Sequence, residues 1–107
     1  MIDIEKEAQN YLTVCSDSKG LSTLTIKAYK IDLKQFCLYM KRRDCFDKNE
    51  LSAYINSLHQ HYKPKTAKRK IACLKAFYRY MEIEEIIEIN PFHKITLKYK
   101  EPITLPK

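Results

Sequence analysis

The residues of this chain that could do chemistry are cations gathered in one stretch, residues 63–81. The stretch reads KPKTAKRKIACLKAFYRYM and holds no acidic residue. Its seven basic residues are Lys63, Lys65, Lys68, Arg69, Lys70, Lys75 and Arg79. Long cationic side chains without acidic neighbours attract polyanions, of which the phosphate backbone of DNA is the natural example.

The same stretch has the apolar spacing of an amphipathic helix. At about 100° per residue, one side collects Ala67, Ile71, Leu74, Phe77, Tyr78 and Met81. Most of the cations fall on the opposite side, and only Lys70 lies near the apolar boundary. A solvated face that merely keeps the domain soluble is the alternative interpretation. The absence of acidic residues favours a binding surface instead.

The net charge of +7 is distributed unevenly along the 107 residues. Residues 21–46 contain six basic and two acidic residues, and residues 63–81 contain seven and none. The segments between and around them are near neutral or acidic. This distribution predicts a directed basic surface rather than a uniformly basic protein.

The length is typical of one domain, and a single glycine argues for helices over a turn-rich β fold. Apolar periodicity predicts helices over residues 4–16, over residues 23–42, after a cap at Asp47, and from Pro64 to Met81. A short fifth helix or a turn fits the acidic, apolar residues 82–89. Residues 92–107 read as an extended linker or tail. The predicted fold class is an all-α, compact four-helix bundle, with a domain over residues 1–90 and a linker over 91–107.

Two predicted helix starts combine hydroxyls, backbone N–H groups and lysines. One is the run from Ser22 to Thr25, followed by Lys27, and the other is Lys65-Thr66. Such starts suit phosphate groups, although capping alone would also explain the hydroxyls, and the two roles can coexist. Lys68 and Arg69 follow closely enough to reach base edges.

No active site is apparent. The four cysteines form no C-x-x-C pair and have no zinc-ligand spacing to the histidines, so buried free thiols are expected at Cys15, Cys37 and Cys73. Tyr11, Tyr29, Tyr54 and Tyr78 lie on apolar stripes, whereas Tyr39, Tyr62, Tyr80 and Tyr99 are more exposed candidates without catalytic partners. We expect no catalytic residue, cofactor or metal. No signal peptide or membrane-length apolar run occurs, which suits a reducing cytosol.

Three segments together resemble the N-terminal core-binding domain, with its SAM-like fold, of the tyrosine recombinase or phage integrase family. The first is LSTLTIKAYKIDLKQFCLYM (21–40), with Ser22, Thr25, Tyr29, Asp32, Leu33 and Phe36 in the family pattern. The second is residues 63–81, with Thr66, Arg69, Lys70, Leu74, Phe77 and Tyr78. The third is Asn90-Pro91, a lysine-rich stretch and Leu105-Pro106, which is similar to the hinge before the catalytic domain.

The resemblance implies a clamp around double-stranded DNA, in which the helices over 23–42 and 64–81 approach the duplex. It favours Thr25, Lys27, Thr66, Lys68 and Arg69 as DNA-facing positions. The full predicted DNA-binding set is Thr25, Lys27, Lys34, Lys65, Thr66, Lys68, Arg69, Lys75 and Arg79. The family's chemistry belongs to a C-terminal domain that these residues do not contain, so no tyrosine here takes the nucleophile's role.

The sequence therefore predicts sequence-biased binding of double-stranded DNA by the N-terminal arm of a recombinase, non-catalytic on its own. Expected partners are a recombination site and further recombinase protomers, with no membrane and no small-molecule substrate. The isolated chain is expected to be monomeric, and its location is expected to be bacterial, cytoplasmic and associated with the nucleoid. The alternative function is a helical protein–protein interaction module, acting through the apolar, acidic segment 82–92.

Overall fold

A computed structural model describes residues 2–95 of the chain. Its elements in order are α1 (Ile4–Asp17), α2 (Thr23–Tyr39), α3 (Lys48–His61), α4 (Pro64–Ile83) and a 3-10 helix, η1 (Pro91–Lys94). No strand occurs among these residues. The all-α prediction and the four predicted helices are therefore confirmed.

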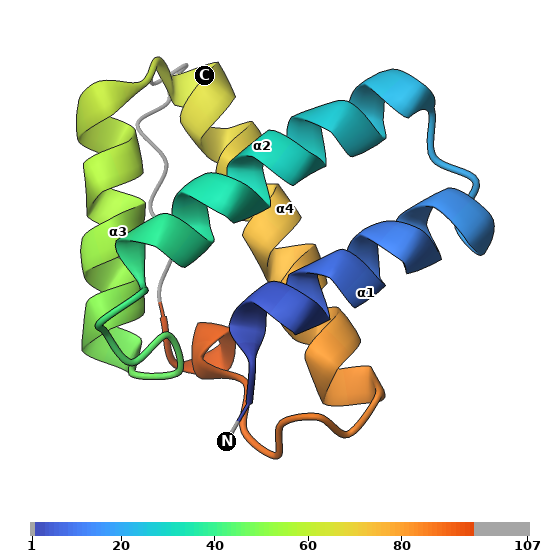
Figure 1. The fold of residues 1–107 in the computed structure, drawn as a ribbon. Coiled ribbons are helices and arrows are strands. Elements are labelled where there is room, and N and C mark those ends of the chain that lie inside the picture. The colour runs from blue at the N-terminus through green and yellow to red at the C-terminus, as the bar shows by residue number, and fades with distance from the viewer. Residues whose placement is uncertain (1, 96–107) are drawn as a thin grey trace, which may run out of the picture.

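The four helices form one bundle around α4. In Figure 1, α1 and α2 lie side by side, and α4 crosses behind both of them. The helix α3 flanks the bundle, where it contacts α4, and η1 lies beside α3. The crossing of α2 and α4 brings together the two segments that carry most of the positive charge.

The core is formed by one apolar stripe from each helix. Leu33 and Phe36 of α2, with Ile71, Phe77 and Tyr78 of α4, are almost fully buried. The Phe36 ring packs edge-on against Tyr54 of α3 and against Tyr78, with centroids 5.4 and 5.9 Å apart. Burial of aromatic and aliphatic side chains is the main favourable term in folding, so these contacts fix how the helices cross.

Three of the helices begin with a side-chain cap. Asp3, Ser22 and Asp47 accept hydrogen bonds from the backbone N–H groups of Lys6, Thr25 and Glu50. The predicted cap at Asp47 is therefore confirmed. The carboxylate of Glu50, in the same first turn, lies 3.7 Å from Nη1 of Arg43. At the end of α1, Gly20 adopts a left-handed conformation with φ of 60°, as expected for the residue that stops a helix.

Two predicted boundaries are wrong. The helix α2 ends at Tyr39 rather than at residue 42, because residues 40–43 form a turn in which the N–H of Arg43 donates to Met40. The helix α4 extends two residues past Met81, to Ile83, before Glu85 reverses the chain with φ of 59°. Of the two alternatives predicted for the acidic, apolar segment that follows, the turn is correct, because residues 84–90 form no helix.

The extended conformation predicted from Phe92 onward is wrong for residues 92–94, which belong to η1. Phe92 is buried, and its ring lies 5.1 Å from that of Tyr78. Asn90 starts this turn by accepting a hydrogen bond from the N–H of Phe92 at 2.9 Å. The rest of the predicted tail, residues 96–107, and Tyr99 within it lie outside the described residues.

All four cysteines are buried free thiols, including Cys45, for which no burial was predicted. Among residues 2–95, no group of His, Cys, Asp or Glu side chains is arranged to hold a metal ion. Within the same range, no helix combines the length and apolar character needed to cross a membrane.

Candidate nucleic-acid interface

The start of α4 is cationic and has no side-chain cap. Lys63 occupies the cap position in an extended conformation without a side-chain hydrogen bond, and Pro64 opens the helix. Lys65 and Lys68 are exposed, and Thr66 is half-buried. Because the first N–H groups of a helix lack helical partners, this start can donate to an anion while the lysines attract it.

One turn later, α4 is bound to α2 through a shared carboxylate. Nη1 and Nη2 of Arg69 donate to Oδ2 and Oδ1 of Asp32 at 2.6 and 3.3 Å. Nζ of Lys70 donates to Oδ1 of the same carboxylate at 2.8 Å. Asp32 is 2% exposed and Lys70 is 5% exposed, so the carboxylate is buried and paired with two cations.

The buried lysine is fully enclosed by polar and aromatic partners. Nζ of Lys70 also donates to Oε1 of Gln35 at 2.7 Å, and it lies 4.8 Å from the centroid of the Tyr62 ring. Nε2 of Gln35 donates to the Tyr62 hydroxyl at 2.9 Å. Tyr62 ends α3, so this network joins three helices just below the start of α4.

Arg69 is the outward-facing member of the cluster. Its side chain remains 44% exposed although both terminal nitrogens contact Asp32. One carboxylate faces two cations, so the cluster keeps one net positive charge, and the exposed guanidinium carries it to the surface.

The start of α2 is organised differently. Oγ of Ser22 accepts from the N–H of Thr25 at 3.2 Å, and the two hydroxyls are 2.9 Å apart. The capping role that was left open for Ser22 is therefore present, whereas Thr66 makes no side-chain hydrogen bond within residues 2–95. Lys27 is exposed on the first turns of α2.

Lys34 does not join this cluster. Residues two apart on a helix are separated by about 200°, so Lys34 projects from the side of α2 opposite Asp32. There it lines a groove between α1 and α2, together with Lys30 and Glu5. This position is exposed, but it faces away from the start of α4.

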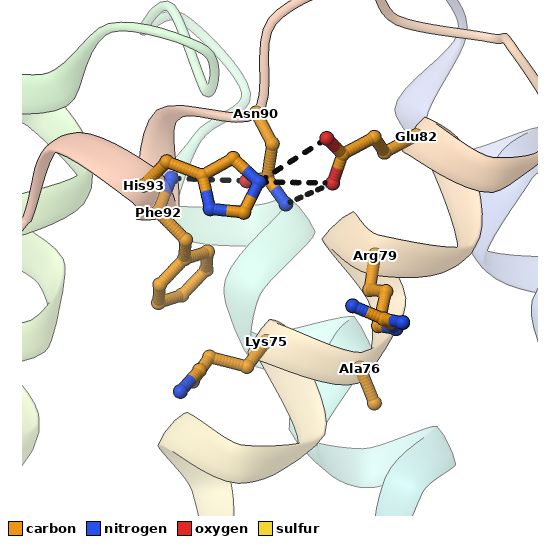
Figure 2. Close-up of a pocket in the computed structure, with 7 residues that line it drawn as sticks. All are labelled: Lys75, Ala76, Arg79, Glu82, Asn90, Phe92 and His93. Atoms are coloured by element: carbon orange, nitrogen blue, oxygen red, sulfur yellow. Dashed lines mark hydrogen bonds and ion pairs between the residues drawn. The ribbon is translucent and has the colours of Figure 1, made fainter.

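Lys75 and Arg79 flank a separate pocket of about 310 Å³ near the end of α4. Figure 2 shows both side chains below Glu82, with Asn90 and His93 reaching toward its carboxylate. Asn90 Nδ2 and His93 Nε2 lie 3.2 and 3.1 Å from Oε1 of Glu82. These hydrogen bonds hold the pKa of Glu82 below its ordinary value.

The predicted residues thus fall into four places. Lys65, Thr66, Lys68 and Arg69 lie together at the start of α4, and Thr25 and Lys27 begin α2. Lys34 lines the groove with α1, and Lys75 and Arg79 line the pocket with η1. The sequence interpretation missed Gln35 and Tyr62 as partners of Lys70. The lone acidic residue of α2, Asp32, was a signal for a pairing partner, but nothing in the sequence identified which cations it meets.

The sequence of this helical bundle also matches a known protein family. The model described as phage integrase, N-terminal SAM-like domain, matches residues 8–85. The chain belongs to this family. The resemblance drawn from the three sequence segments is therefore confirmed, and the bundle is the family's SAM-like domain.

Curated relatives of this integrase-type domain are tyrosine recombinases. A tyrosine recombinase of Agathobacter rectalis is 43% identical over 100% of this chain and 36% of its own length. Tyrosine recombinase XerC of Staphylococcus saprophyticus is 29% identical over 92% of the chain and 35% of its own length. Tyrosine recombinase XerC of Lacticaseibacillus casei is 31% identical over 84% and 32%. The chain spans about a third of the length of these relatives. No solved structure matched it.

Proposed function

We propose that this domain binds double-stranded DNA as the N-terminal arm of a tyrosine recombinase, and that it is non-catalytic on its own. The observation that carries the proposal is the start of α4, which is cationic, lacks a side-chain cap and is held in place by a buried network. Family membership supports the same conclusion, because the matched relatives are named tyrosine recombinases.

The proposed contacts combine two kinds of donor. Lys65, Lys68 and the first N–H groups of α4 bind backbone phosphates, and Thr66 adds a hydroxyl donor beside them. Arg69 is placed to reach a base edge or a phosphate. Thr25 and Lys27, at the start of α2, provide a second set of contacts to the DNA. Lys34, Lys75 and Arg79 contribute at the margins, because the structure places them on other faces.

The surrounding assignments belong to the same proposal. Of the predicted linker over 91–107, residues 91–94 belong to the folded domain, and the residues that follow η1 lead toward a catalytic domain. Neighbouring recombinase protomers contact the domain on DNA. The isolated domain is monomeric and prefers its recombination site over random sequence. It acts in the bacterial cytoplasm on the nucleoid.

A charge-reversal experiment tests DNA binding. The variant Lys65→Glu/Lys68→Glu is compared with Lys6→Glu/Lys48→Glu, which changes the charge equally. The control residues are exposed in the first turns of α1 and α3, at the opposite end of Figure 1 from the start of α4. Glutamate also suits the first turn of a helix, so the control should fold.

Binding is measured by fluorescence anisotropy with a labelled duplex across a salt series. We expect at least about a tenfold loss of affinity for the α4 variant and a salt slope lower by about two units. The control should lose less than about threefold. Equal losses in the two variants, or no duplex binding by the unchanged domain at low salt, would contradict the proposal.

A second candidate function, protein–protein interaction, is favoured by the distribution of exposed apolar side chains. Leu24, Ile31 and Leu38 recur every seven residues on one face of α2. Ile83 ends α4, and Ile89 lies in the turn that follows it. Lysines neighbour the first group and glutamates neighbour the second. If sedimentation detects self-association that Ile83→Lys abolishes, while duplex binding is absent, this second function replaces the first.

A further inference from the structure

The shared carboxylate of Asp32 has an arrangement that stability alone does not require. A single buried lysine, Lys70, already neutralises it and lies among Gln35, Tyr62 and the carboxylate itself. Arg69 is nevertheless drawn to the same carboxylate from the surface through both of its terminal nitrogens. This second cation is the exposed one, and it lies beside the start of α4.

The guanidinium has donors left over. An arginine carries five N–H donors in a rigid plane, and the two contacts to Asp32 occupy one hydrogen on each terminal nitrogen. The other three donors are not used by the carboxylate. Because the plane is fixed on one edge, the direction of the remaining donors is fixed as well.

We propose that Asp32 is a positioning residue, which orients the guanidinium of Arg69 toward the nucleic acid while Lys70 neutralises the carboxylate. The inference rests on the proposed function and adds a mechanism to it. An unrestrained arginine must lose rotamer freedom when it binds DNA, and an arginine already fixed by Asp32 has lost it during folding. Lys70 ensures that the carboxylate does not cancel the charge that Arg69 presents.

If the Asp32 charge is removed, simple electrostatics and positioning predict opposite changes in the affinity for DNA. A missing negative charge beside a phosphate-binding surface should tighten DNA binding if charge alone matters. Positioning predicts weaker binding, because Arg69 loses its restraint. Removing the carboxylate alone would also leave Lys70 buried without its counter-ion, so a second substitution is needed to preserve folding.

The central variant is therefore Asp32→Asn/Lys70→Met, which has the net charge of the unchanged protein. Asparagine has one acceptor oxygen in place of two, and methionine fills a similar volume without a buried charge. Arg69→Ala and Arg69→Lys are made in both backgrounds. Folding of each variant is established by circular dichroism and urea unfolding, and binding is measured well below the unfolding transition.

We expect the double variant to bind a labelled duplex about five- to tenfold more weakly with an unchanged salt slope. Arg69→Ala and Arg69→Lys should each cost about tenfold in the original background and less than about threefold in the double variant. A purely structural role for Asp32 would leave the cost of changing Arg69 equal in both backgrounds. That result, or tighter binding by the double variant, would overturn the inference.

A second variant covers the case in which the double variant fails to fold. Asp32→Glu keeps the charge and displaces the carboxylate by one methylene, so it should weaken binding at constant net charge, whereas unchanged binding would overturn the inference. The two proposals fail separately. If the unchanged domain does not bind duplex, the proposed function fails, and if it binds but Asp32 and Arg69 act independently, only this inference fails.

Discussion

The starts of α2 and α4 have similar sequences of hydroxyls and lysines but are stabilised in different ways. At α2, Ser22 caps the helix through the N–H of Thr25, and the two hydroxyls also contact each other. At α4, Lys63 provides no side-chain cap. That helix is held instead by the contacts of Arg69 and Lys70 with Asp32, 37 and 38 residues earlier in the chain.

Because of this difference, the start of α2 serves mainly the stability of the fold, whereas the start of α4 is left available for binding. A local cap consumes the donors and hydroxyls that a phosphate would otherwise use, so the start of α2 is committed mainly to structure. A helix fixed by contacts one turn later can leave its first N–H groups uncapped. The start of α4 is therefore the stronger candidate for binding.

The largest expected effect on stability comes from removing the Asp32 carboxylate, which joins α2 to Arg69 and Lys70 of α4. Asp32→Ala leaves the buried ammonium of Lys70 without its counter-ion, and we expect a loss of about 3 kcal/mol or more in the free energy of unfolding. Urea unfolding followed by circular dichroism measures it. Asp17→Ala, at the exposed end of α1, should change stability by less than about 0.5 kcal/mol. A similar small change for Asp32→Ala would show that α4 is anchored elsewhere.

Removing one hydroxyl from each start should produce opposite phenotypes. Ser22→Ala deletes the cap of α2 and should cost about 1 kcal/mol of stability with little effect on duplex binding. Thr66→Ala should leave stability nearly unchanged and weaken binding severalfold, because its hydroxyl makes no hydrogen bond within residues 2–95. Urea unfolding and anisotropy on the same two proteins check this. Stability loss in Thr66→Ala without a binding defect would reverse the assignment.

A cap can also be added to α4. Lys63→Ser places a capping hydroxyl before Pro64 and should stabilise the domain by about 0.5–1 kcal/mol, because the first turn gains an acceptor. Thermal unfolding measures the gain. Lys63→Ala, which removes the same charge without adding a hydroxyl, is the matched control. Equal stability of the two variants would indicate that the first turn is already satisfied.

The smallest effect is expected at the opposite end of α4, where Glu82 joins the helix to Asn90 and His93. The pKa of Glu82 is lowered in the folded state, so its contribution to stability is present at neutral pH and is lost as the pH falls through that lowered pKa. Glu82→Gln should therefore reduce the acid destabilisation between pH 6 and about pH 3. Identical pH profiles for the two proteins would exclude this contribution.

Periodicity predicted the parts of the fold that depend on local pattern. Helical spacing correctly placed the apolar stripe of α4 in the core, because burial follows that spacing directly. The stripe consists of Ala67, Ile71, Leu74, Phe77, Tyr78 and Met81. The end of α2 was missed, since no glycine or proline follows Tyr39 and basic residues extend a helical pattern equally well. The burial of Phe92 was also missed, because it depends on contact with Tyr78 rather than on a pattern.

The candidate site was predicted as a set of residues but not as a geometry. The helical wheel separated the cations of α4 from its core and left only Lys70 at the boundary, where the structure buries it beside Asp32. The wheel could not show that Lys34 faces α1, or that Arg69 is engaged by a carboxylate on another helix. Pairings across 37 residues depend on how helices cross, and a single sequence does not encode the crossing in any local signal.

The buried thiols can serve as probes of local unfolding in this domain. Burial raises the pKa of Cys37 and Cys45 to about 11 and that of Cys73 to about 12, so at neutral pH these sulfurs are protonated and shielded from reagents. The side chain of Cys73 is fully buried, so its alkylation must follow a transient opening that exposes the sulfur. The labelling rate of Cys73 would thus measure the local opening of α4 in the native protein, without any substitution.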